Sequence, residues 1–360
     1  MRKIGKVTMS AAVAAAVGLV AAACSSSPST TSNASTVSSG GNSSCKSGQT
    51  SNVVALSGFQ VCLFASATTT MNHPDDIQVV GDHVWIGWQN QSAKDGSTKV
   101  PSTLAEYDTS GKLVKTWSLI GHVDGLTMDP ATNTMWVTAN EDAKPNLYLV
   151  NPSSSSFTTV TVPPLPHGGG LDDLRFVNGS AYISASNPTL NSAGINTHPA
   201  IYKVTVSGTA AHLTGVFNAN AKATTLNPPI STMTLNLTDP DSQTIDPSGD
   251  LVLNSQGDQE LIFVHSIGTK SQKLTVLSLG AQVDDTVWPT SSKGCMIIAD
   301  NASGVYSVCS DIWVTGTPIV DAANDGTTIS FAGSLNLGTG QITPFLVGMN
   351  NPHGMGFIAK

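Results

Sequence analysis

The chain has 360 residues and a formal net charge of -8, and only 11% of its residues are charged, well below the usual quarter. Hydrophobic residues make up 40%, which is enough for a sizeable core, and a large all-β fold can hold such a length in one domain. The acidic balance and the lack of a basic face argue against a nucleic-acid partner.

Residues 1–23 have the pattern of a lipoprotein-type signal peptide. The basic start "MRKIGK" precedes the apolar run "MSAAVAAAVGLVAAA", which is too short and too rich in Ala for a membrane-spanning helix. The stretch "LVAAAC" resembles a bacterial lipobox, with Ala21 in place of the usual Leu, and implies lipidation of Cys24. We therefore expect an exported protein that contacts the cell membrane only through this lipid. Ordinary cleavage before Cys24, which would leave a soluble secreted protein, is the alternative.

Residues 24–50 are expected to be a disordered tether. This stretch is rich in Ser and Thr and has almost no apolar side chains to bury, so no core would offset the entropy lost on ordering it. One domain is then expected over residues 51–360.

Four further cysteines predict two disulfides in an exported protein. Cys295 and Cys309 lie in "GCMIIADNASGVYSVCS", and a hairpin turn centred on Ala302 would place them opposite each other. Antiparallel partners of this kind have Cα atoms about 4.5 Å apart, which a disulfide tolerates. By elimination Cys45 pairs with Cys62 and pins the end of the tether. Four buried free thiols are the alternative.

A four-residue pattern, which we call the head, recurs along the rest of the chain. The six heads are HPDD (73–76), HVDG (122–125), HGGG (167–170), DPDS (239–242), QVDD (282–285) and HGMG (353–356). Their spacings are 49, 45, 72, 43 and 71 residues. Repeats of this length, with insertions in some units, are typical of propellers and solenoids.

The segments after the heads predict short strands. Runs such as "HVWIGWQN", "TMWVTANE" and "CMIIADNA" follow turn signals, and further runs such as "NLYLVNP", "GVYSVCS" and "LVKTWSL" complete four strands per unit. The predicted fold is therefore all-β, a six-bladed β-propeller with four-stranded blades. The insertions at 187–199, 218–238 and 311–329 are expected to be lids over a channel mouth or disordered decoration.

The last head lies so close to the C-terminus that only an innermost strand can follow it. A propeller must close its ring or leave sheet edges exposed. We therefore expect the outer strands of the last blade to come from "NVVALSGFQVCLFAS" at residues 52–66, so that N- and C-terminal strands close the ring together.

Two stretches resemble a known superfamily. "MIIADNASGVYSV" resembles the rhythm of NHL-repeat propellers, and "GSLNLGTGQITPFLVGMNNPHGMGFI" is similar to blades of gluconolactonase-like proteins. The resemblance covers residues 55–360 as architecture and implies a six-bladed propeller. In the gluconolactonase group a Glu in a "GEGP"-type motif helps to hold a divalent metal, and the first head here has no such Glu. Peptidylhydroxyglycine lyase and streptogramin lyase are more similar in using central His residues.

The heads are the expected functional site, because the innermost strands of a propeller begin around one mouth of its channel. Positions one and three of a head share a face, since side chains alternate along a strand. Position one predicts four metal ligands: His73, His122, His167 and His353. The full set of expected ligand-binding residues is His73, Asp75, Asp76, His122, Asp124, His167, Asp241, Asp284 and His353.

Neutral imidazoles bind borderline transition ions, and three of them with a water make an open metal site. One divalent ion, Zn²⁺, Mn²⁺ or Ca²⁺, is the expected cofactor, with Asp75 and Asp124 orienting the rings. A purely structural ring of His-to-backbone contacts is the alternative.

Two functions remain open. One is a monomer that binds a small ligand or a protein partner at the mouth; the other is a metal-dependent hydrolase or lyase. The fold does not choose between them, and no catalytic residue is assigned.

Overall fold

The structure is a computed structural model, and it describes residues 52–323 and 329–360. The predicted signal peptide, the predicted tether, Cys24 and Cys45 lie outside the described residues, and so does the expected Cys45–Cys62 pairing. Within the described ranges, no helix has the length and hydropathy that crossing a membrane would require.

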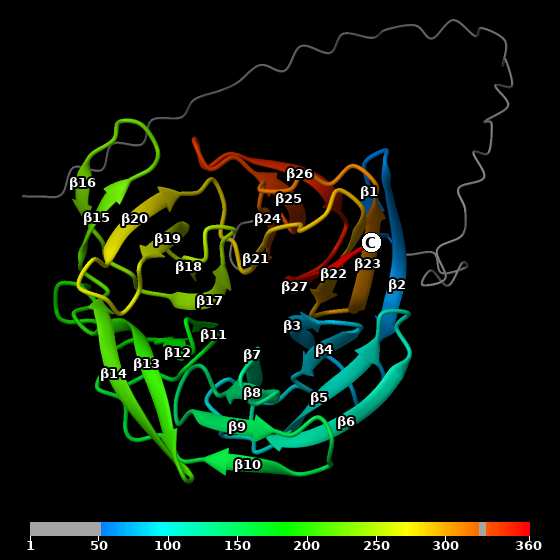
Figure 1. The fold of residues 1–360 in the computed structure, drawn as a ribbon, viewed down its shortest axis with the longest axis horizontal. Helices are drawn as coiled ribbons and strands as arrows, with labels where there is room; N and C mark the ends of the chain where they lie inside the picture. The colour runs from blue at the N-terminus through cyan, green and yellow to red at the C-terminus, as the bar shows by residue number, and fades with distance from the viewer. Residues whose placement is uncertain (1–51, 324–328) are drawn as a thin grey trace, which may run out of the picture. The chain divides into compact units, whose positions relative to one another are not determined.

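Six sheets lie around a common axis, and the first three are built in chain order (Figure 1). Blade 1 contains β3 (Pro74–Val80), β4 (His83–Trp88), β5 (Pro101–Asp108) and β6 (Leu113–Ile120). Blade 2 contains β7 (Val123–Asp129), β8 (Thr134–Ala139), β9 (Asn146–Val150) and β10 (Phe157–Val160). Blade 3 contains β11 (Leu174–Val177), β12 (Ser180–Ser184), β13 (Pro199–Ser207) and β14 (Ala210–Asn218).

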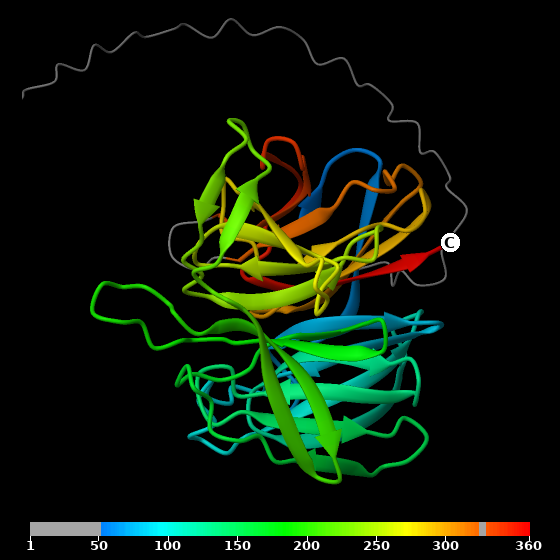
Figure 2. The same cartoon turned by 60° about the vertical axis from the view of Figure 1, so that its left-hand side comes forward.

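Blade 4 is larger than predicted because two more strands extend its outer edge. Its inner strands are β17 (Pro240–Ile245), β18 (Leu251–Ser255), β19 (Glu260–His265) and β20 (Lys273–Ser278). Beyond them lie β15 (Lys222–Thr225), parallel to β20, and β16 (Thr232–Thr234). This yellow-green hairpin extends from the blade in Figure 2. Part of the expected insertion at 218–238 is therefore an ordered extension of a sheet.

Blades 5 and 6 interleave along the chain. Blade 5 contains β21 (Thr286–Val287), β24 (Ile319–Ala322), β25 (Phe331–Leu335), β26 (Ile342–Val347) and β1 (Val54–Ala55). Blade 6 contains β27 (Pro352–Ala359), β22 (Gly294–Asp300), β23 (Gly304–Ser310) and β2 (Phe59–Ser66). The chain thus leaves blade 5 after β21, forms the β22–β23 hairpin in blade 6, and returns to blade 5 at β24.

This interleaving corrects the predicted make-up of the fifth blade. We expected "CMIIADNA" to follow the fifth head within one blade, but Thr286 pairs with Val320 of β24, whereas Cys295 pairs with Ile358 of β27. The expected insertion at 311–329 therefore contains β24, whose residues are all buried. An apolar run does not specify its neighbour, because strand pairing depends on packing against the rest of the fold.

Closure of the ring by both ends of the described chain is confirmed. C-terminal β27 is the innermost strand of blade 6, and N-terminal β2 is the outermost, pairing with β23 from Phe59↔Ser310 to Ser66↔Gly304. β1 instead joins blade 5, where Val54 pairs with Val347. Four blades have the predicted four strands, whereas blade 4 has six and blade 5 has five.

The hydrophobic core lies between neighbouring blades. Trp85 and Trp117 of blade 1 stack with ring centroids 5.2 Å apart and pack with Leu126 and Val137 of blade 2. Because neighbouring blades cover both faces of a sheet, central strands are continuous apolar runs, and every residue of β22 is buried. The inner strands are therefore held from both sides, which fixes the residues where they begin.

The disulfide between Cys295 and Cys309 is confirmed. The two residues lie directly opposite each other on β22 and β23, with Cα atoms 4.0 Å apart. Because disulfides persist in oxidising compartments, this bond suggests an extracytoplasmic location.

Candidate functional site

Several inner strands break their regular pairing at the same point, just after they begin. The break follows Pro74 in β3, Val123 in β7, Pro240 in β17 and Pro352 in β27. A β-bulge inserts an extra residue and redirects its side chain. The first residue within each of these four breaks is, in the same order, Asp75, Asp124, Asp241 and His353. All four line one cavity, so the bulges are what aim the site residues into the channel mouth.

The backbone shows that the sixth head was misaligned by two residues. In three blades, the residue directly after the second strand donates its backbone N–H to the carbonyl oxygen of the first head residue. The pairs are Gln89 to His73, Asn140 to His122 and Asn301 to Asn351. The sixth head therefore begins at Asn351. His353 then takes the third position, where other blades have Asp.

Blade 3 needs a correction of three residues. Asp173 accepts the N–H of the residue after it at 2.6 Å, as Asp76 does in blade 1 at 2.7 Å. Asp172 is therefore the third-position residue, and the true head is 170–173, which "HGGG" overlaps only at Gly170. The expectation of four His at one repeat position is wrong, because only His73 and His122 share it.

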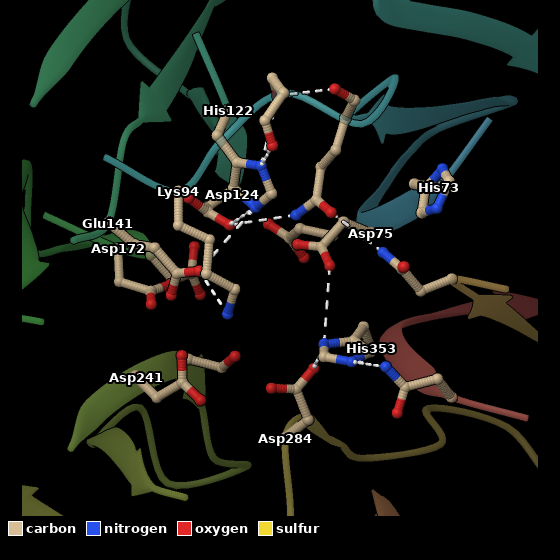
Figure 3. A pocket seen from close by; sticks show the side chains of 18 of the residues that line it. His73, Asp75, Lys94, His122, Asp124, Glu141, Asp172, Asp241, Asp284 and His353 are labelled. Carbon is tan, nitrogen blue, oxygen red and sulfur yellow. Dashed lines mark hydrogen bonds and ion pairs between the residues drawn. The ribbon is translucent and has the colours of Figure 1, made fainter. Parts of the chain in front are cut away.

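In this alignment the third position is acidic in five blades and His in the sixth. We call the five buried carboxylates the acid ring: Asp75, Asp124, Asp172, Asp241 and Asp284. With His353 they line a cavity of about 340 Å³ at the channel mouth (Figure 3). Eight of the nine expected residues line this cavity: His73, Asp75, Asp76, His122, Asp124, Asp241, Asp284 and His353.

The fourth position forms a separate layer that links the blades. In blades 1, 3 and 5 it is an Asp whose carboxylate accepts a backbone N–H from the next blade. The pairs are Asp76–Leu126, Asp173–Gln243 and Asp285–Met355, at 2.6 to 2.8 Å. In blade 2 this position is Gly125, where a Cβ would lie 2.4 Å from Asp173 Cα. The Arg175 guanidinium forms ion pairs with Asp76 and Asp173. The carboxylates of this layer are therefore already engaged within the protein.

His122 presents a free nitrogen to the cavity. Its Nδ1 lies 2.7 Å from the Ser92 carbonyl oxygen, which can only accept, so Nδ1 carries the proton. The unprotonated Nε2 lies 3.8 Å from both Asp124 Oδ1 and Glu141 Oε1. Among the described residues, His122 Nε2 and Asp124 Oδ2 are buried atoms with no hydrogen-bond partner. Burial lowers the pKa of His122, which keeps the ring neutral and able to bind a metal.

Two groups of potential metal ligands meet at Glu141. His122, Asp124 and Glu141 each offer an atom within 4.8 Å of the others, and so do Glu141, Asp172 and Asp241. The Glu141 carboxylate also forms an ion pair with Lys94, with Oε1 and Nζ 2.7 Å apart. Sequence reasoning missed both partners of this pair, because each belongs to the connection between the second and third strands of its blade rather than to a head. Asp172 was missed through the misaligned third head.

The cavity is lined by acidic groups, and burial raises the pKa of each acid-ring carboxyl, with Asp241 reaching about 7. Glu141 differs: burial acts to raise its pKa, but Lys94 and His122 outweigh burial and lower it. Unpaired buried charges are costly, so the ring favours a bound cation or a basic side chain among its carboxylates.

The other two expected histidines at the mouth have different settings. His353 Nδ1 lies 3.3 Å from Asp284 and 3.7 Å from Asp75, across the cavity from His122. His73 lies at the rim with a left-handed backbone (φ 54°), and its Nδ1 contacts Asn72 Oδ1 at 2.7 Å. Neither belongs to the ligand groups around Glu141.

His167 lies apart from the cavity. It is fully buried, and its ring nitrogens contact the Tyr202 hydroxyl at 3.2 Å and the Gly170 carbonyl oxygen at 2.9 Å. Both nitrogens are therefore engaged within the protein, so neither is available to a ligand in the cavity.

No protein-family model and no curated protein matches this chain. Among solved structures, the chain is similar to a streptogramin B lyase, with 15% identity, a TM-score of 0.45, and 82% of this chain and 90% of that one covered. It is also similar to virginiamycin B lyase from Staphylococcus aureus (12% identity, TM-score 0.43, 70% of this chain and 99% of that one). A third is a protein of unknown function from Bacteroides caccae (7% identity, TM-score 0.46, 80% and 87%). Similarity at this level carries no argument about activity.

Proposed function

We propose that the channel mouth binds one divalent cation and, with it, a small ligand. The observation that carries this proposal is the buried, unpartnered pair of His122 Nε2 and Asp124 Oδ2 beside the Glu141 carboxylate. Leaving a buried polar atom without a partner costs about 1–3 kcal/mol, and a bound ion would remove that cost. Three ligand atoms would hold the ion and leave its remaining positions open.

The donor set favours Mn²⁺ or Zn²⁺ over Ca²⁺. One imidazole and two carboxylates form a mixed nitrogen and oxygen site, whereas Ca²⁺ prefers oxygen ligands alone. The Ser92 carbonyl supports such a site because it holds His122 in the tautomer that a metal needs.

The ligand would occupy the rest of the cavity, against the open side of the ion. Its walls are carboxylates and amides, so a small molecule with cationic or hydrogen-bond-donating groups fits it better than an apolar one. We propose that the protein acts as a monomer and that its partner is a small molecule.

A metal-dependent hydrolase or lyase is the second candidate, and His353 favours it. This imidazole lies across the cavity from His122, beside Asp284, where it could exchange a proton with a ligand held by the ion. An ion in the site would supply Lewis-acid chemistry.

We also infer that the protein acts outside the cytoplasm, held at the membrane by lipidation of Cys24. The lipobox-like stretch and the Cys295–Cys309 disulfide support this inference. Replacing Cys24 with Ser should move the protein from the membrane fraction to the soluble fraction; retention of the variant in the membrane fraction would contradict anchoring through this residue.

Calorimetric titration tests the cation site. Protein purified without a His tag and stripped with a chelator should bind Mn²⁺ or Zn²⁺ with a stoichiometry of about one. The variant His122→Ala should lose this binding, because it removes the one imidazole of the ligand set. Asp124→Asn should weaken binding, because an amide oxygen is a poorer ligand than a carboxylate.

His212→Ala is the matched control, because His212 is an exposed residue of β14 outside the cavity. It should bind as the wild type does. Equal binding by His122→Ala and wild type, or no binding of any divalent ion by wild type, would refute the proposed site.

A further inference from the structure

We infer that Lys94 is a built-in counter-cation that a divalent ion must displace, and that it makes the site select divalent over monovalent cations. This inference rests on the proposed cation site and assigns to it a residue that is not among the ligands. Lys94 Nζ lies 2.7 Å from Glu141 Oε1, a contact that Figure 3 shows on the same side of the acidic cavity as Asp172.

Glu141 is the carboxylate that Lys94 and a metal ion would share. It belongs to both groups of potential ligands, with His122 and Asp124 on one side and Asp172 and Asp241 on the other. An ammonium group at hydrogen-bond distance from Glu141 and a divalent ion bound by the same carboxylate would repel each other at short range. Binding of the ion therefore requires the ammonium to move away.

The connection that carries Lys94 allows such a movement without a change of backbone. The Asn90 and Gln91 backbones have positive φ (53° and 61°), the Ser92 hydroxyl donates to the Gln89 carbonyl at 2.6 Å, and the Lys94 carbonyl accepts the N–H of Asp142 at 3.1 Å. The Lys94 side chain, in contrast, is 57% exposed. A long side chain with this exposure can swing into solvent while its backbone stays in place.

The same connection prepares the metal ligand. Its Ser92 carbonyl fixes the tautomer of His122, and two residues later Lys94 neutralises Glu141. One short segment thus orients a ligand and balances the charge of another.

Selectivity follows from the charges. When a monovalent ion replaces the ammonium, the charge among the buried carboxylates stays the same and the ion must still be dehydrated. A divalent ion adds one positive charge to a ring of carboxylates in a partly buried site, where electrostatic interactions are stronger than in water. Lys94 therefore excludes Na⁺ and K⁺ and yields to divalent ions.

The test compares wild type with Lys94→Gln, Lys94→Arg and the control Lys99→Gln. Lys99 is exposed on the same connection and does not line the cavity, and its replacement changes the net charge equally. Mn²⁺ affinity is measured by calorimetry at constant ionic strength, with either K⁺ or a large organic cation as the monovalent salt.

Lys94→Gln should bind Mn²⁺ about tenfold more tightly than wild type, since one competing charge is gone. Its affinity should fall when K⁺ replaces the organic cation, whereas wild type, Lys94→Arg and Lys99→Gln should show no such dependence. Binding by Lys94→Gln alone would overturn the inference, because the ammonium would then bar divalent ions from the wild-type site as well as monovalent ones.

Equal Mn²⁺ affinity of wild type and Lys94→Gln would overturn the role of Lys94 and leave the cation site standing. Weaker binding by Lys94→Gln would also overturn it, because Lys94 would then assist the ion. An absence of binding in all four proteins would overturn the site and the inference together.

Discussion

Asp285 Oδ2 accepts the backbone N–H of Met355 at 2.7 Å and thereby joins blade 5 to the C-terminal strand of blade 6. The same relationship joins blade 1 to blade 2 and blade 3 to blade 4. Three such contacts, which we call latches, alternate around the ring just below the acid ring. The cavity therefore stands on a layer that holds neighbouring blades in register.

Removing a latch should destabilise the fold. Asp285→Ala should lower the free energy of unfolding by about 1–3 kcal/mol, because the Met355 N–H would lose its acceptor inside the protein. Asp285→Asn keeps an acceptor oxygen and should cost less. Chemical denaturation measures both, with Asp311→Ala at a surface position as the control. Equal losses for the Ala and Asn variants would show that the acceptor is unimportant.

The metal-free protein should become less stable as pH rises from about 4 to about 8. Burial raises the pKa of Asp173 to about 8 and those of Asp241 and Asp321 to about 7, so the folded chain holds protons that the unfolded chain has released. These carboxyl groups contribute their full stabilisation of the fold below their unfolded-state pKa near 3.8. This stabilisation is lost as the pH rises through their folded-state pKa values. His122, with its lowered pKa, acts in the opposite sense below about 6.5.

Thermal melts across this pH range, with and without Mn²⁺, measure the effect. The stabilisation by Mn²⁺ should be larger at pH 8 than at pH 5, because protons compete with the ion for the carboxylates. A metal-free melting temperature that rises steadily between pH 5 and 8 would contradict the assigned pKa directions.

The Cys295–Cys309 disulfide should stabilise the β22–β23 hairpin and, through it, blade 6. A double Cys-to-Ser variant at these positions should lose about 2–4 kcal/mol of unfolding free energy, the typical effect of removing one native crosslink. Urea denaturation of the variant and of wild type measures the difference. An unchanged midpoint would mean that the paired strands around the bond already hold the hairpin closed.

Deletion of residues 52–66 should prevent closure of the ring. It removes β1 and β2, and so exposes the edges of β26 and β23 in two blades. We expect aggregation or a large fall in the melting temperature, measured by size-exclusion chromatography and thermal melts. Deletion of residues 25–44 in the predicted tether is the control and should leave melting unchanged. A soluble monomer with wild-type melting after deletion of residues 52–66 would contradict the closure.

The sequence alone determined the blade count, the closure and the Cys295–Cys309 pairing. Each depends on a local signal or on a simple exclusion: turn residues mark hairpins, apolar runs mark strands, and a last head near the C-terminus leaves its outer strands to the other end of the chain. The clearest echo is "MNHP" at 71–74 and "MNNP" at 349–352, which shows the true alignment of the first and last heads. An ungapped alignment of the heads on His73 and His353, instead of on Pro74 and Pro352, conceals this correspondence.

Only the tertiary structure decided which strands pair and which side chains meet. β22 joins β27 rather than the strand before it, because neighbouring blades compete for the same apolar runs. The bulges that aim Asp75 and Asp124 into the cavity depend on pairing register, which a four-residue pattern does not encode. Lys94 and Glu141 lie outside every repeat position, and they meet only because the curvature of the ring brings two connections over one mouth.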